Sequence, residues 1–93
     1  MAGYIGGLKM DFIHHTDGAH GWIEADKSLL SDLGIADKIT SYSYQRGDKV
    51  YLEEDCDLNT LIKALNAKNI NYTLFELYRD ESPIRNYDRY SRA

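Results

Sequence analysis

The chain has 93 residues, of which 43% are hydrophobic and 28% are charged, and its formal net charge is -4. This length allows one domain with a thin core, and this composition excludes a disordered chain. The surplus of acidic residues argues against binding of a nucleic-acid backbone, because neutralising phosphates requires an excess of Lys and Arg.

The N-terminal part of the chain predicts a hairpin. Residues 1–7 contain three glycines and are expected to form a flexible leader. Residues 8–15 alternate apolar and polar side chains, the pattern of a half-buried strand, and residues 20–25 are typical of a returning strand. Asp17 and Gly18 between them form a strong turn signal.

A short helix and a second hairpin follow. Asp26 is a good N-cap for a helix of about two turns, and Gly34 is a natural stop. Residues 41–46 and 49–54 are rich in strand formers, and the two-residue turn between them begins with Gly47.

The last elements are a second helix and a strand. Asp57 is expected to cap a helix whose leucine and isoleucine side chains recur along residues 58–65 with helical spacing. Asn69 can end this helix, and residues 71–78 predict a final strand. Residues 81–93 are expected to form a polar tail after Ser82-Pro83 breaks the pattern.

The order β-β-α-β-β-α-β predicts an α+β fold. We expect one domain over residues 8–80, built as a two-layer sandwich with two short helices on one face. The sheet should contain about five mainly antiparallel strands, because short hairpins join neighbours. The strand order is left open.

The cysteine content and hydropathy predict a cytoplasmic protein. The one cysteine cannot form an internal disulfide, which fits a reducing compartment. No stretch approaches the roughly 18 apolar residues of a membrane span, and residues 1–7 lack the features of a signal peptide. Phosphate-binding, dinucleotide and nucleophile-elbow motifs are also missing, so we expect no membrane, no cofactor and no enzymatic activity.

Tyrosines gather on one predicted sheet face. The two-residue turn fixes a register in which Tyr42, Tyr44, Tyr51 and Glu53 share a face, and Trp22 can join them. An antiparallel sheet can leave such a face open, and an open aromatic face predicts a binding or dimerisation surface. The alternative is a set of stabilising cross-strand pairs that the tail partly covers.

An acidic run precedes the second helix. Glu53, Glu54, Asp55 and Asp57 surround Cys56, and negative charge is favourable at a helix N-terminus. The same run can instead bind a basic partner surface or a divalent cation, although it lacks the spacing of an EF-hand loop. Cys56 has no matched base in the sequence.

The histidines suggest a weaker metal hypothesis. His14, His15 and His20 flank the first turn together with Asp17, and two imidazoles with a carboxylate can hold zinc. The spacing matches no established metal motif. The alternative is a polar hairpin end whose histidines titrate near neutral pH.

The tail alternates aromatic and basic residues. Arg85, Tyr87, Arg89 and Tyr90 are of the types favoured as interface anchors, so the tail can dock on a partner. It can also lie back on its own domain through Ile84 and Tyr87, or stay disordered.

Four segments of the chain resemble parts of other short proteins. Residues 21–24, 29–39, 41–44 and 50–57 resemble a group of short uncharacterised proteins from phages, plasmids and other bacterial mobile elements, over roughly residues 20–88. The resemblance implies no catalytic residue. It implies a setting in which small acidic proteins bind and block host proteins.

These observations favour a non-enzymatic protein-binding module that uses the tyrosine-bearing face and the acidic loop, with a protein partner. Three alternatives are open. The first is an anti-defence inhibitor that mimics nucleic acid, the second a small metal-binding protein or enzyme built on the histidine hairpin, and the third a self-associating structural protein that forms a homodimer.

Overall fold

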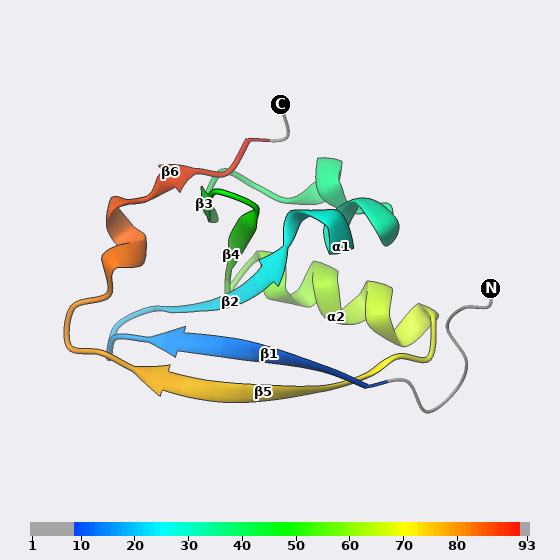
Figure 1. Cartoon of the computed structure of the whole chain (residues 1–93), viewed down its shortest axis with the longest axis horizontal. Helices are drawn as coiled ribbons and strands as arrows, with labels where there is room; N and C mark the ends of the chain where they lie inside the picture. The colour runs from blue at the N-terminus through cyan, green and yellow to red at the C-terminus, as the bar shows by residue number, and fades with distance from the viewer. Residues whose placement is uncertain (1–8, 92–93) are drawn as a thin grey trace.

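The computed structural model describes residues 9–91 as an α+β domain whose single sheet has six strands in the order β5-β1-β2-β4-β3-β6 (Figure 1). The strands are β1 (Lys9–Thr16), β2 (Gly21–Asp26), β3 (Tyr44–Arg46), β4 (Lys49–Glu53), β5 (Asn71–Tyr78) and β6 (Asp88–Arg89). The helices are α1 (Lys27–Asp32) and α2 (Asp57–Ala67), and Ala36–Lys38 and Pro83–Asn86 form 3-10 turns. The predicted α+β class is confirmed.

Strand pairing is mainly antiparallel, as predicted. The β3–β4 register joins Tyr44 to Tyr51 and Arg46 to Lys49, which confirms the two-residue turn. The exception is β5, which runs parallel to β1 along all eight residues of each strand. A parallel pair needs a crossover, and α2 forms the last part of the long connection between these strands.

The main core lies between the sheet and the two helices. Ile23 and Leu52 face the helices from β2 and β4 and are fully buried. On α2, Leu61 and Leu65 are 1% exposed because their four-residue spacing places them on one face. From α1, Leu30 packs into the same core.

The helices end at the predicted stops, but only one of the two predicted N-caps is in place. Gly34 (φ +73°) and Asn69 (φ +58°) both adopt the left-handed backbone that ends a helix. The N-cap of α2 is Cys56, so the prediction that Asp57 caps this helix is wrong. Asp26 is the N-cap of α1 as predicted, but its carboxylate makes no capping bond and pairs with Lys49.

Residues 82–91 fold back onto the sheet instead of extending from it. Figure 1 shows this segment running from the end of β5 back to β3, where β6 pairs with it. Ile84 is 2% exposed and packs with Trp22 and Tyr51 on the sheet face opposite the helices, with Tyr87 beside them. The alternative in which the tail lies on its own domain is therefore confirmed for Ile84 and Tyr87. The predicted leader, residues 1–7, lies outside the described residues.

The strand predicted from residue 41 begins only at Tyr44. Residues 40–43 instead turn around a buried carboxylate, since Thr40 and Ser43 both donate to Asp57. Over residues 9–91, no helix is long and apolar enough to cross a membrane.

Candidate binding pocket

The aromatic cluster on the outer sheet face is the floor of the candidate site. Trp22 in β2 is paired with Glu53 in β4, and Tyr44 in β3 is paired with Tyr51 in β4. Trp22 and Tyr51 are 2% and 8% exposed because the tail covers them. The tyrosine-bearing face is therefore closed at these two residues and open at its end near Tyr44.

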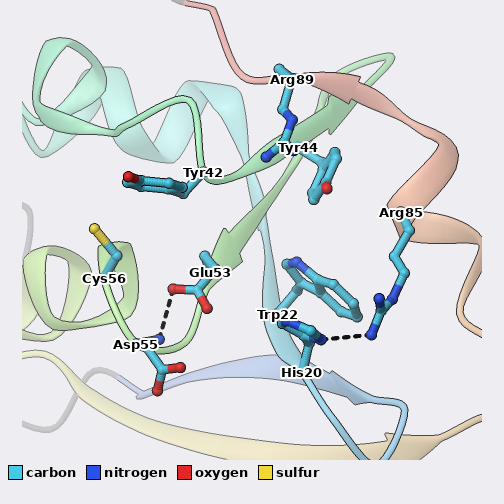
Figure 2. A pocket seen from close by; sticks show the side chains of 9 residues that line it. All are labelled: His20, Trp22, Tyr42, Tyr44, Glu53, Asp55, Cys56, Arg85 and Arg89. Atoms are coloured by element: carbon cyan, nitrogen blue, oxygen red, sulfur yellow. Dashed lines mark hydrogen bonds between the residues drawn. The ribbon is translucent and has the colours of Figure 1, made fainter.

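A pocket of about 580 Å³ opens at that end (Figure 2). Nine residues from the sheet, the acidic loop and the tail line it: His20, Trp22, Tyr42, Tyr44, Glu53, Asp55, Cys56, Arg85 and Arg89. The structure thus brings together candidates from three separate parts of the sequence.

Arg85 forms one wall of the pocket and is held by the first hairpin. Its Nε donates to Asp17 Oδ2 at 2.8 Å, and its terminal nitrogen donates to His20 Nδ1 at 2.6 Å. The guanidinium lies over Trp22, 5.8 Å from the ring centre. The hydrogen bond from Arg85, with one from the His20 amide, lowers the pKa of Asp17 to about 2.

Arg89 forms the upper wall and has no anionic partner among residues 9–91. Its guanidinium lies 4.7 Å from the ring centre of Tyr44, a cation–π contact, and donates to the Ser41 carbonyl at 3.3 Å. Two side chains from the tail therefore cover two aromatic rings of the sheet. Arg89 keeps free donors for a ligand, because the described contacts use few of its five N–H groups.

The opposite wall is acidic. Glu53 is half-buried, and its Oε1 accepts from the Asp55 amide at 2.9 Å. Burial raises the pKa of Glu53, and the nearby carboxylates of Asp55, Glu54 and Asp57 raise it further. Within the described part of the chain, neither Glu53 nor Asp55 forms a salt bridge.

A buried hydrogen-bond network positions this acidic wall. The Glu53 amide donates to Ser43 Oγ at 2.9 Å, and Ser43 Oγ donates to Asp57 Oδ2 at 2.5 Å. Thr40 donates its amide and its hydroxyl to the same carboxylate and accepts from the Tyr42 amide at 3.2 Å. The sequence gives no signal for Thr40 or Ser43, since their acceptor lies 14 to 17 residues further along the chain.

Several predicted site residues lie outside the pocket. Asp57 is 1% exposed and holds the turn described above, so it does not belong to an exposed acidic patch. Glu54 does not line the pocket, and its Oε1 bonds His14 at 2.9 Å. Tyr87 packs against Tyr51, and Tyr90 donates its hydroxyl to the Ala36 carbonyl at 2.5 Å.

The histidines take separate partners. Consecutive positions on β1 point His14 and His15 to opposite sheet faces, where they bond Glu54 and Glu24, each at 2.9 Å. His20 is the acceptor for Arg85. Across residues 9–91, no three His, Cys, Asp or Glu side chains are grouped so that they could hold a metal ion.

The pocket offers binding groups without an evident catalytic pair. The Cys56 sulfur lies 3.8 Å from the Thr40 hydroxyl, and no His, Asp or Glu side chain within residues 9–91 hydrogen-bonds to it. The lining holds the rings of Trp22, Tyr42 and Tyr44, two guanidinium groups and two carboxylates. Such groups can stack on a ligand and pair with its charges.

No family model, curated protein or solved structure matches the chain. The resemblance to proteins of mobile elements therefore stays a prediction.

Proposed function

We propose that the protein is a non-enzymatic protein-binding module, and that its pocket takes a basic side chain of the partner. The observation that carries this proposal is the pair of carboxylates, Glu53 and Asp55, that line an aromatic pocket and form no salt bridge within residues 9–91, although Arg85 and Arg89 line the same pocket. A Lys or Arg side chain supplies that cation.

The ring of Tyr42 suits the same ligand. Tyr42 is 66% exposed at the mouth of the pocket, and Figure 2 shows it on the same side as Glu53 and Cys56. A guanidinium on an exposed aromatic face gains about 0.5–1 kcal/mol, in addition to its pairing with carboxylates. Arg89 on the upper wall can donate to a carbonyl or carboxylate of the same segment.

The distribution of carboxylates favours one basic side chain over a broad basic surface. Of the acidic run, only Glu53 and Asp55 line the pocket, whereas Glu54 pairs with His14 and Asp57 is buried. A nucleic-acid mimic needs its carboxylates on one contiguous surface, so this scatter counts against the anti-defence alternative.

An NMR titration with N-acetyl-arginine-N-methylamide tests the proposal. We expect saturable shifts at Tyr42, Glu53 and Asp55 with a dissociation constant of about 1–10 mM. Glu53→Gln should weaken binding about tenfold, because it removes the half-buried charge. Asp32→Asn, an exposed carboxylate at the end of α1, is the matched control and should bind normally.

The pH dependence gives an independent check. Because burial raises the pKa of Glu53 above 4.5, affinity for the arginine derivative should fall as pH is lowered toward 4.5. The fall should be smaller in Glu53→Gln. Affinity that is equal in both proteins at neutral pH would contradict the proposal.

Affinity capture from a bacterial lysate then identifies the partner. The unaltered protein and Asp32→Asn should retain the same protein after nuclease treatment, while Tyr42→Ala and Glu53→Gln should lose it. Capture that survives both pocket variants would place the binding surface elsewhere.

A further inference from the structure

The two edges of the sheet are built differently. At one edge, the outermost strand is β6, which has two residues and pairs with β3. At the other edge, β5 has eight residues and, in the described part of the chain, pairs with β1 alone. About half of the backbone N–H and C=O groups of such an edge strand point away from its neighbour.

β5 also lacks the features that usually protect an edge strand. Its sequence, NYTLFELY, contains no Lys and no Pro. Its one charged residue is Glu76, whose carboxylate already accepts from the Thr16 hydroxyl at 2.9 Å. A long, weakly charged edge of this kind is a template for another strand.

An apolar patch reaches this edge on the outer sheet face. Ile13 in β1 is paired with Phe75 in β5, and Leu77 lies two residues further along the same face. These side chains are 40%, 54% and 39% exposed. The tail covers Trp22 and Tyr51 on the same face, but it leaves this part of the sheet uncovered.

We propose that the β5 edge binds a second copy of this chain, as an antiparallel β5–β5 pair centred on Phe75. A twofold axis perpendicular to the sheet keeps both outer faces on one side, so the two patches merge into one. In this register Phe75 meets Phe75 of the second copy, and Tyr72 meets Tyr78. Glu76 meets Leu74, so no like charges are opposed.

In the register centred on Phe75, the residues of one β5 strand therefore pair favourably with those of a second, identical β5 strand. The register centred on Glu76 would place two carboxylates directly opposite, which is unfavourable. A foreign strand needs no such symmetry, whereas a self-complementary strand of low charge favours an isologous dimer. Because one strand edge and a few side chains are buried, the interface stays below about 1,200 Å², the size range of weak complexes.

Sedimentation velocity over about 10 μM to 1 mM tests self-association. We expect the weight-average mass to rise from monomer toward dimer over this range. Phe75→Lys should abolish the rise, since its charge would meet a like charge on the axis. Tyr42→Lys replaces another exposed aromatic residue, which lies in the binding pocket, and should leave the rise unchanged, so the test does not depend on the proposed function.

Disulfide trapping tests the register. In a Cys56→Ser background, Phe75→Cys places two thiols on the twofold axis, within reach of a disulfide. Thr73→Cys is the matched control, because its two thiols are separated by about four residues, or roughly 13 Å. Oxidation at about 1 mM protein should cross-link Phe75→Cys at least about tenfold faster than Thr73→Cys.

Circular dichroism should show that Phe75→Lys and Phe75→Cys keep their secondary structure, because the Phe75 side chain is more than half exposed. A monomer at every concentration up to about 1 mM overturns the proposal, and so does faster cross-linking at Thr73→Cys.

Discussion

Replacing Asp57 by alanine removes the acceptor that holds residues 40–43 in place. The carboxylate accepts from the Thr40 amide, the Thr40 hydroxyl and the Ser43 hydroxyl, and it is 1% exposed. Each hydrogen bond to a charged group contributes about 1.5–3 kcal/mol, and a donor left buried without an acceptor adds to the cost. Since these contributions overlap, we expect a loss of about 3–5 kcal/mol in the free energy of unfolding.

Urea denaturation followed by circular dichroism measures this loss. With a slope of about 1 kcal/mol/M, the midpoint should fall by about 3–5 M, or the variant should already be unfolded in water. Asp55→Ala is the matched control, because this carboxylate lies two residues earlier and is exposed. Its effect should stay within about 0.5 kcal/mol. A loss below about 1 kcal/mol for Asp57→Ala, or equal losses for both variants, would refute the structural role of Asp57.

Two other contacts of the tail give further predictions. The hydrogen bond from Arg85 lowers the pKa of Asp17 to about 2. The resulting stabilisation is therefore complete above about pH 4 and is lost as pH falls toward 2, so the stability difference between the unaltered protein and Arg85→Ala should shrink over that interval. A constant difference from pH 6 to pH 2 would contradict it. Ile84 is 2% exposed and packs beside Trp22, so Ile84→Ala leaves a cavity there and should lower the free energy of unfolding by about 2–4 kcal/mol. Water that enters this cavity should shift the fluorescence of Trp22 to the red. Unchanged emission would count against this packing.

Local patterns in the sequence predicted the elements and one register. The turn that begins at Gly47 adopts positive φ (+60°), which fixes the pairing of Tyr44 with Tyr51 before any tertiary contact is considered. The boundaries predicted for residues 71–78 are those of β5, because strand-forming residues fill the segment and Asn69 ends the preceding helix.

Contacts between residues far apart in the sequence determined the features that local patterns did not predict, namely the cap of α2 and the sixth strand. Asp57 is a typical capping residue by type and position. Its carboxylate instead accepts a hydrogen bond from Thr40, 17 residues earlier, and Cys56 occupies the N-cap position. The sixth strand depends on Asp88 and Arg89 meeting β3. Two polar residues after a turn carry no strand signal of their own.

The pocket could be predicted only in parts. Its aromatic, acidic and basic residues were each recognisable by type, but their convergence depends on the tail. Arg85 reaches the pocket because Asp17, 68 residues earlier, anchors its guanidinium beside Trp22. No local sequence pattern can indicate a contact between residues so far apart in the chain.

The pocket and the β5 edge lie on different parts of the same sheet. The pocket is built on β2, β4 and β3, whereas β1 separates β5 from β2 by about 10 Å. Pairing through β5 would therefore leave the pocket of each copy open and give a dimer with two sites. A partner with two basic segments would then bind more tightly than either pocket alone, by a factor that depends on the spacing of those segments. Phe75→Lys should remove this gain while leaving the affinity of each pocket for N-acetyl-arginine-N-methylamide unchanged, because that small ligand occupies one pocket at a time.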